Sequence, residues 1–245
     1  MSTDIKQRIS TMGYLFVAER LVVEPSITAV DSTLLKANGH VWHKSSINKG
    51  IVPHSGIDTG ARWGYSHTKG WVFGYKLHLT STTGDLVVPL TADVTTANVS
   101  DNKMYVPLTS SSSSFSVFSL PSLRYIVADP GYDDKKLYEY SKGLGIDLVC
   151  PVERYESTPK KRLELVCFYQ SVLGQAIYNQ RRISVEPLIE HIKSIFRIDP
   201  LPVQGFHKVS AIVLLSVVLY QLMIYYNCKT DKINPKSIKY MLGTG

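Results

Sequence analysis

The chain has 245 residues, of which 44% are hydrophobic and 19% are charged. This composition excludes an intrinsically disordered chain, and the length is sufficient for one domain with a sizeable core. Lysine and arginine number 27 against 20 aspartate and glutamate residues, which gives a formal net charge of +7. A moderate positive excess favours a polyanionic partner such as nucleic acid without requiring one.

Three cysteines lie far apart, at positions 150, 167 and 228, and none belongs to a C-x-x-C pair. An odd number of scattered cysteines argues against a disulfide framework or a zinc site and favours a reducing compartment. The first residues contain no apolar stretch of the kind that begins a secretory signal. We therefore expect a cytoplasmic protein.

The chain begins with a predicted helix, followed by a strand that carries an acidic side chain. Residues 1–26 predict a short helical lead-in that ends near Pro25. Residues 28–35 predict a strand, and Asp31 lies in its middle. A loop rich in Gly, His and Lys is expected from there to about residue 70.

The next segment predicts a hairpin. Residues 72–80 alternate apolar and polar side chains, as in a half-buried strand, with Lys76 and His78 on the polar face. A turn signal and the apolar run at residues 86–90 predict its antiparallel partner. A short helix is expected after residue 100.

Two strand–helix units follow. Residues 125–129 predict a compact buried strand that ends at Asp129, directly before Pro-Gly. Asp133 or Asp134 is expected to open the next helix, which a glycine ends. Residues 148–150 predict a fifth strand, and the remainder of the chain predicts mostly helix.

The predicted order is three strands, a helix, a strand, a helix, a strand and further helices. This is the chain order of an α/β, RNase H-like fold, a mixed five-stranded sheet flanked by helices. In that topology the first and fourth strands lie side by side at the centre of the sheet. Asp31 and Asp129 would then be neighbours, although 98 positions separate them in the sequence.

A close pair of aspartates carries a chemical implication. Two like charges at short range cannot both stay ionised without compensation, so such a pair shares a proton or binds a metal ion. Oxygen ligands alone favour Mg²⁺ or Mn²⁺ over zinc. A third acidic ligand would complete a site for two metal ions.

Glu186 is the best candidate for that third acid. Ser184 can cap a helix at this point, and Pro187 is tolerated in the first turn, where backbone donors are unpaired. Residues seven apart on a helix differ by about 20° in direction, so Glu186 and Lys193 share a face. Glu190, one turn further on, is the alternative acid.

This segment resembles the last motif of insertion-sequence DDE transposases of the group marked by a Tyr, Arg, Glu, Lys series. That family places two residues between Tyr and Arg, three between Arg and Glu, and six between Glu and Lys. Arg182, Glu186 and Lys193 match the last two spacings. Tyr178 does not match, because three residues separate it from Arg182.

Other stretches resemble the same family, namely the first-aspartate strand, the following strand and an Asp-Pro-Gly-Tyr motif. The resemblance covers about residues 27–227, which would form an RNase H-like catalytic domain. Residues 1–26 would be a remnant of an amino-terminal region, and residues 228–245 a tail. The stretches are residues 29–33, 71–79 and 129–132.

The resemblance implies an enzyme that cuts and joins DNA strands in transposition, with two Mg²⁺ or Mn²⁺ ions held by Asp31, Asp129 and Glu186. It also implies double-stranded DNA as transposon ends and target, a homo-oligomer on DNA, nucleoid association and no membrane partner. The residues expected to contact DNA are Tyr178, Arg181, Arg182, Lys193, Lys76 and His78.

Three features leave alternatives open. The aromatic and basic stretch 62–71 suits DNA contact or the packing of its two tryptophans. Residues 209–226 carry no charge, which fits a membrane span or, given the resemblance, a core helix packed on the sheet. Only 30 residues precede Asp31, fewer than in relatives, so the chain is either an active enzyme or a truncated, catalytically inactive DNA-binding remnant.

Overall fold

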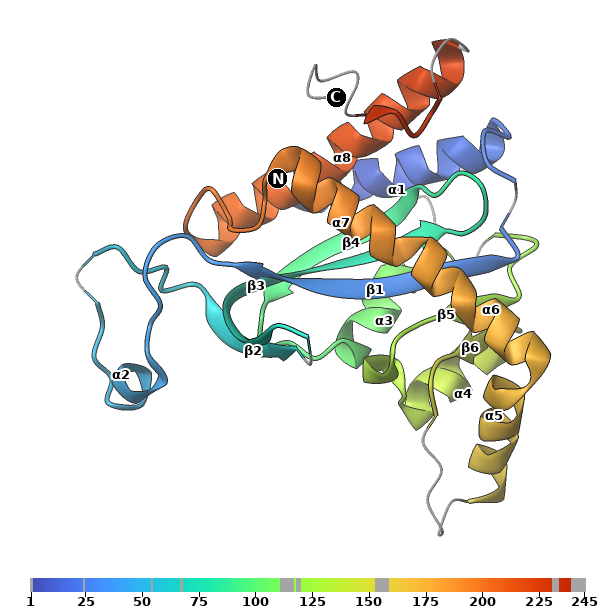
Figure 1. Ribbon diagram of the computed structural model, residues 1–245, viewed down its shortest axis with the longest axis horizontal. Helices are drawn as coiled ribbons and strands as arrows, with labels where there is room; N and C mark the ends of the chain where they lie inside the picture. The colour runs from blue at the N-terminus through green and yellow to red at the C-terminus, as the bar shows by residue number, and fades with distance from the viewer. Residues whose placement is uncertain are drawn as a thin grey trace.

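The computed structural model describes residues 2–23, 25–53, 55–66, 68–110, 117, 120–152, 159–230 and 234–238. In this part of the chain six strands form one mixed sheet, in the order β2-β3-β1-β5-β6, with β4 also paired to β3 (Figure 1). The strands are β1 (Ile27–Lys36), β2 (Arg62–Ser66), β3 (Gly70–Thr82), β4 (Pro89–Thr96), β5 (Tyr125–Val127) and β6 (Asp147–Val149).

Helices cover both faces of the sheet (Figure 1). One face packs on α1 (Ser2–Ala18), α6 (Val172–Ile183), α7 (Val185–Phe196) and α8 (Phe206–Thr230). The other packs on α3 (Asn102–Thr109) and α4 (Lys135–Gly143). The remaining described helices are α2 (Lys44–Asn48), the 3-10 turn η2 (Pro130–Tyr132) and α5 (Lys160–Gln170).

The predicted centre of the sheet is confirmed. Strand β1 pairs in parallel with β5 on one side, with Ala29 opposite Val127, and antiparallel with β3 on the other. The first and fourth predicted strands therefore lie side by side, as the RNase H-like order requires. The close approach of β1 and β3 needs a glycine at position 74, because a Cβ there would lie 2.0 Å from the carbonyl oxygen of Leu35.

Two strands differ from their predictions. The hairpin partner of β3 begins at Pro89 rather than at residue 86, because the alternation that pairs with β3 runs through Leu90, Ala92 and Val94. Strand β2 lies within the segment predicted as a loop. It pairs with β3 so that the rings of Trp63 and Phe73 lie opposite each other, with centroids 5.5 Å apart. This ring contact stabilises β2, although the glycine-rich composition of the segment predicts a loop.

Strand β3 is buried on both faces, whereas the alternating pattern predicts one hydrated face. Lys76 and His78 are both buried beneath the segment that leads into α3. Their polar atoms are compensated locally: Lys76 Nζ donates to the backbone oxygen of Val99, and His78 Nε2 lies 2.8 Å from Thr95 Oγ1. Buried polar side chains with such partners are compatible with a central strand.

Helix α8 packs along α1 and β4, next to the amino-terminal helix in Figure 1. Within the described residues it is one helix that is long and apolar enough to cross a membrane, and 56% of its most apolar window is buried inside the protein. Gln221 is fully buried and donates two hydrogen bonds, to the backbone oxygens of Ile9 and Pro89. These contacts support the prediction of a core helix.

Replacing Gln221 with leucine is expected to lower the free energy of unfolding by about 2–4 kcal/mol, because two buried carbonyl groups lose their donor. Urea unfolding followed by circular dichroism measures the effect. Leu222→Gln, at an exposed position of the same helix, is the matched control and should change stability by less than about 0.5 kcal/mol. Equal stability of Gln221→Leu and the unmodified chain would show that this docking contact contributes little.

Candidate active site

Strands β1 and β5 place two aspartates at the same edge of the sheet. Asp31 and Asp129 each follow the paired residues Ala29 and Val127 by two positions. A backbone N–H orients each carboxylate, since Ser32 donates to Asp31 Oδ1 at 2.8 Å and Gly131 donates to Asp129 Oδ1 at 2.9 Å. The parallel register thus brings together the two acids that the sequence places far apart.

Both carboxyl groups have a raised pKa. Burial raises the pKa of Asp31 to about 6, and the negative charge of Asp129 adds to this rise. Burial also raises the pKa of Asp129, and the neighbouring Asp101 adds to that rise. Arg181 opposes both shifts. Lys76 also lowers the pKa of Asp129, but the pKa values of both aspartates stay raised, so the cluster is short of positive charge.

Arg181 joins two of the three predicted acids. Its Nη2 lies 3.0 Å from Asp31 Oδ1, and its Nη1 lies 2.5 Å from Glu186 Oε1. Asp129 also raises the pKa of Arg181 through its charge. Arg181 therefore pairs with Asp31 on β1 and Glu186 on α7, and it interacts electrostatically with Asp129, which follows β5.

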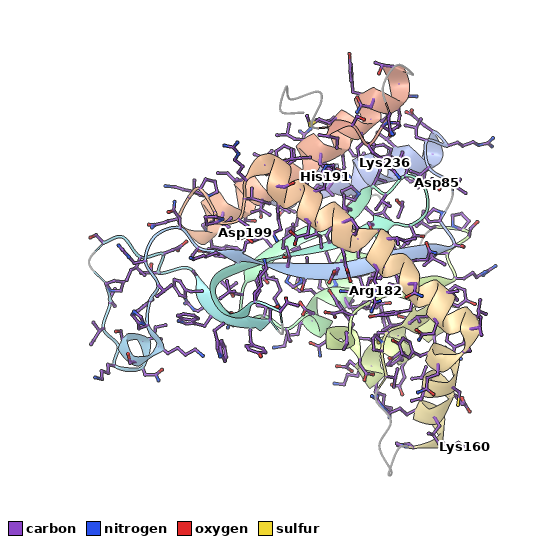
Figure 2. All side chains as sticks on the ribbon, in the orientation of Figure 1. Asp85, Lys160, Arg182, His191, Asp199 and Lys236 are labelled. Atoms are coloured by element: carbon purple, nitrogen blue, oxygen red, sulfur yellow. The ribbon has the colours of Figure 1, made fainter. Side chains whose placement is uncertain are left out.

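Adjacent arginines on α6 have different surroundings. The side chain of Arg181 is largely buried between the carboxylates, whereas Arg182 is exposed (Figure 2). Consecutive helical residues differ by about 100° in direction, so only one of two neighbours can point into a given site. DNA contact by Arg181 stays a prediction. In the structure its guanidinium forms ion pairs with Asp31 and Glu186.

The junction between α6 and α7 sets these directions. Ser184 ends α6 and begins α7 with φ −117° and ψ −86°. The predicted capping role of Ser184 is wrong, because its hydroxyl donates back to the carbonyl oxygen of Gln180 and no side chain caps α7. Buried Val185 and Leu188 hold the first turn of α7 on the core, which leaves Glu186 beside Arg181.

Lys193 does not reach the acidic cluster. Its ammonium lies 2.7 Å from Glu190 Oε1 and 3.5 Å from Asp199 Oδ2, at the far end of α7. Tyr178 is also buried and packs edge-to-face on Tyr169, with ring centroids 5.3 Å apart. DNA contact by Lys193 and Tyr178 stays a prediction, and both side chains have structural partners.

Lys76 and His78 face away from Asp31. Asp31 is opposite Leu79 in the β1–β3 register, whereas Ser32 is opposite His78, so Lys76 and His78 point to the face that α3 covers. Their DNA contact also stays a prediction. Burial lowers the pKa of His78 to about 4, with Asp101 opposing and Lys76 adding to the shift.

Asp101 is a functional candidate that the sequence reasoning missed. Its Oδ1 accepts hydrogen bonds from Ser32 Oγ at 2.7 Å and Lys76 Nζ at 3.0 Å, and it lies 3.7 Å from His78 Nδ1. Because Asp101 also raises the pKa of Asp129, it connects the two faces of the sheet at the site. A lone aspartate before a short helix resembles an ordinary cap, so no local signal distinguishes it.

A further polar group faces the acids from η2. Tyr132 is fully buried, and within the described residues its hydroxyl has no hydrogen-bond partner. Burial raises the pKa of Tyr132, and Asp101, Asp31 and Asp129 add to the rise. Buried hydroxyl groups in proteins usually have a hydrogen-bond partner. A polar ligand bound at this position would give the Tyr132 hydroxyl such a partner.

The sheet order, with Asp31 within β1 and Asp129 just after the neighbouring strand β5, defines an RNase H-like α/β domain with an acidic site. The chain matches the family model of the transposase DDE domain over residues 23–222, and it belongs to that family. No curated protein and no solved structure matches the chain. Its function is therefore related to DNA transposition, and the family implies DNA binding.

DDE transposases generally use divalent metal ions. The carboxylate side chains of this site are of the type that binds such ions. The donors are carboxylate oxygens with raised pKa values, beside an unpartnered tyrosine hydroxyl. In the described part of the chain, no three His, Cys, Asp or Glu side chains lie close enough to hold a metal ion together. The guanidinium of Arg181 is paired with both Asp31 and Glu186.

Proposed function

We propose that this protein is a DNA transposase whose catalytic residues are Asp31, Asp129 and Glu186. The observation that carries the proposal is the gathering of these acids around Arg181, since Arg181 binds two of them and interacts electrostatically with the third. Carboxylates that lie close together repel one another unless a cation compensates their charge, so such a site favours the binding of positive ions.

Asp31, Asp129 and Glu186 would hold two Mg²⁺ or Mn²⁺ ions. When bound, such ions activate water or a 3′-hydroxyl for attack on phosphorus and stabilise the departing oxygen. The backbone N–H groups of Ser32 and Gly131 fix the direction of the two aspartates in advance. This orientation lowers the reorganisation that strand cleavage requires.

Arg181 would change partners when DNA arrives. A guanidinium binds a carboxylate or a phosphate with the same forked geometry, so Arg181 can move from Glu186 to a DNA phosphate without losing its charge compensation. Two residues separate Tyr178 from Arg181, which is the Tyr–Arg spacing of the Tyr, Arg, Glu, Lys group, whereas four residues rather than three separate Arg181 from Glu186. Spacing from Glu186 favours Arg182, but Arg181 is the arginine that pairs with Asp31 and Glu186, so we assign the arginine of this motif to Arg181, with Arg182 as an exposed contact to the DNA backbone.

The proposed substrate is double-stranded DNA at the ends of an insertion sequence and at its target, and the proposed acting form is a homo-oligomer on DNA, in the nucleoid. Residues 1–26 precede the proposed catalytic domain, residues 27–227. Helix α1, within that range, buries Ile5, Ile9 and Phe16 in the main core. This packing supports a structural role for the segment besides any recognition.

The test is nicking of duplex DNA that carries the inverted repeats flanking the coding sequence. With Mg²⁺ or Mn²⁺ present, we expect strand cleavage at the repeat ends, and none with a chelator. A matched duplex with scrambled repeats measures specificity. Binding of the duplex without cleavage in either metal would establish the alternative, a catalytically inactive DNA-binding remnant.

A further inference from the structure

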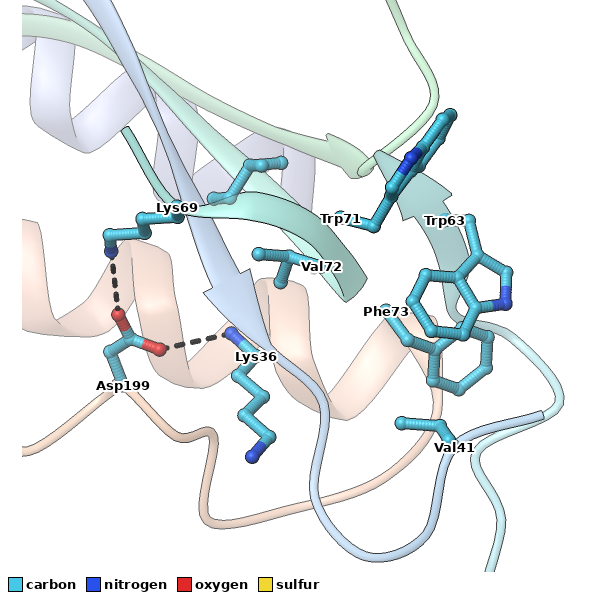
Figure 3. A pocket seen from close by; sticks show the side chains of 9 residues that line it. Lys36, Val41, Trp63, Lys69, Trp71, Val72, Phe73 and Asp199 are labelled. Carbon is cyan, nitrogen blue, oxygen red and sulfur yellow. Dashed lines mark hydrogen bonds and ion pairs between the residues drawn. The ribbon is translucent and has the colours of Figure 1, made fainter. Parts of the chain in front are cut away.

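A hollow of about 440 Å³ lies at the end of β1 that is remote from β5. Strands β1, β2 and β3 and the loop after α7 line it, with Trp63 on one wall and Asp199 on another (Figure 3). Sites that hold a small flat molecule have volumes of roughly 300–1,000 Å³. The hollow is therefore large enough for a single nucleobase.

Exposed aromatic rings stand next to this hollow. Trp71 and Tyr65 are paired across the β2–β3 hairpin and are 58% and 55% exposed, with ring centroids 5.4 Å apart. Lys44 Nζ lies 3.1 Å from the centre of the Trp71 ring. Trp63, by contrast, packs on Phe73. The two tryptophans of the aromatic and basic stretch thus differ, since one packs and the other presents a ring to solvent.

The charge around the hollow is positive. Asp199 is the acid in its lining, and it accepts from the Lys36 backbone N–H at 3.0 Å and from Lys69 Nζ at 3.2 Å (Figure 3). Lys193 also lies 3.5 Å from this carboxylate. The ammonium groups of Lys69 and Lys193 therefore both face this one carboxylate. Such a surface is complementary to a polyanion that also carries flat rings.

The hollow and the acidic cluster share strand β1. Asp31 and Lys36 are five residues apart, which corresponds to about 17 Å along an antiparallel strand. Five nucleotides of a stacked DNA strand occupy about the same length at ~3.4 Å each. A DNA strand cut at the acids can therefore reach the hollow a few nucleotides away.

We propose that the hollow and the Tyr65–Trp71 pair bind an unpaired nucleotide of DNA, with its base stacked on a ring and its phosphates held by Lys44 and Lys69. An unpaired base fits better than a base pair, because only a base outside the duplex offers its whole face for stacking. This inference rests on the proposed function, since it adds a strand-binding subsite to the proposed transposase.

The test is equilibrium binding of fluorescently labelled oligothymidylate to the full chain, measured by anisotropy. Trp71→Ala should weaken binding about 5- to 100-fold, the range for the loss of one base–aromatic stack. Trp71→Phe, which keeps a ring, should bind within about threefold of the unmodified chain. Tyr226→Ala on α8 removes an equally exposed ring, 56% exposed, and should leave binding unchanged.

Blunt duplex DNA of the same length is the second probe, and we expect Trp71→Ala to change its binding by less than about twofold, since stacking needs an unpaired base. Unchanged oligothymidylate binding by Trp71→Ala would overturn the inference. So would an equal loss on blunt duplex, or tighter binding of oligouridylate than of oligothymidylate. Metal-dependent cleavage is scored separately. Cleavage by the unmodified chain with unchanged Trp71→Ala binding would sink this inference alone, whereas intact stacking without cleavage would sink the proposed function alone.

Discussion

Replacing Asp31 with asparagine is expected to reduce DNA cleavage by a factor of about 10³ or more, which is at least about 4 kcal/mol in the activation barrier. The amide keeps the shape of the side chain but removes the negative charge that the proposed site requires. Asp129→Asn and Glu186→Gln should have comparable effects. Duplex binding should stay close to that of the unmodified chain, because these acids add no attraction for phosphate. Cleavage rates and binding isotherms measured with the same repeat-end duplex separate the two quantities.

Two other acids serve as controls for this series. Asp85→Asn removes an exposed carboxylate in the turn before β4 and should cleave normally (Figure 2). Glu190→Gln should also cleave normally, because Glu190 is paired with Lys193 rather than with Arg181. Loss of cleavage in Glu190→Gln together with normal cleavage in Glu186→Gln would transfer the third role to Glu190. Normal cleavage by any of the three proposed catalytic variants would remove that residue from the site.

Asp31 and His78 are expected to give opposite dependences of stability on pH. The pKa of Asp31 is raised from 3.8 to about 6, so its contribution to stability is full below pH 3.8 and is lost as the pH rises to about 6. The pKa of His78 is lowered from 6.5 to about 4, so its contribution is full above pH 6.5 and is lost as the pH falls to about 4. Each effect is on the order of 2–3 kcal/mol, and between pH 4 and 6 they largely offset each other.

Single variants of Asp31 and His78 should separate the two opposing pH dependences of the free energy of unfolding. Asp31→Asn leaves the effect of His78, so its free energy of unfolding should rise between pH 4 and 6.5. His78→Gln leaves the effect of Asp31, which Asp129 reinforces and Arg181 opposes, so its free energy of unfolding should fall with rising pH over the same window. Urea unfolding at four pH values measures both slopes in metal-free buffer. Parallel slopes in the two variants would contradict the burial of both groups in their neutral forms, Asp31 protonated and His78 unprotonated.

The fold was largely predictable because its signals are local. Alternation in β3 and the compact apolar run of β5 each appear within a few residues, and their chain order then implies the sheet order. The proximity of Asp31 and Asp129 follows from that order alone. Strand β2 was not predictable in the same way, since it is stabilised by the cross-strand contact between Trp63 and Phe73.

The details of the site depend on contacts that no local pattern contains. A motif spacing cannot tell whether Arg181 or Arg182 points inward, because the direction is set at the α6–α7 junction. Lys193 shares a helical face with Glu186, but its long side chain reaches Glu190 and Asp199 instead. Asp101 enters the site through Ser32 on β1 and Lys76 on β3, which lie 69 and 25 positions away from it in the sequence.

The docking of α8 on α1 has a consequence for synthesis of the chain on the ribosome. Gln221 bonds to residues 212 and 132 positions earlier in the sequence, Ile9 and Pro89. At about 5–20 residues per second, roughly 10–40 s pass between translation of the first helix and of its partner. During that interval the nascent α1 carries Ile5, Ile9 and Phe16 without the surface that later buries them, and a chaperone at the exit tunnel would find its binding site there.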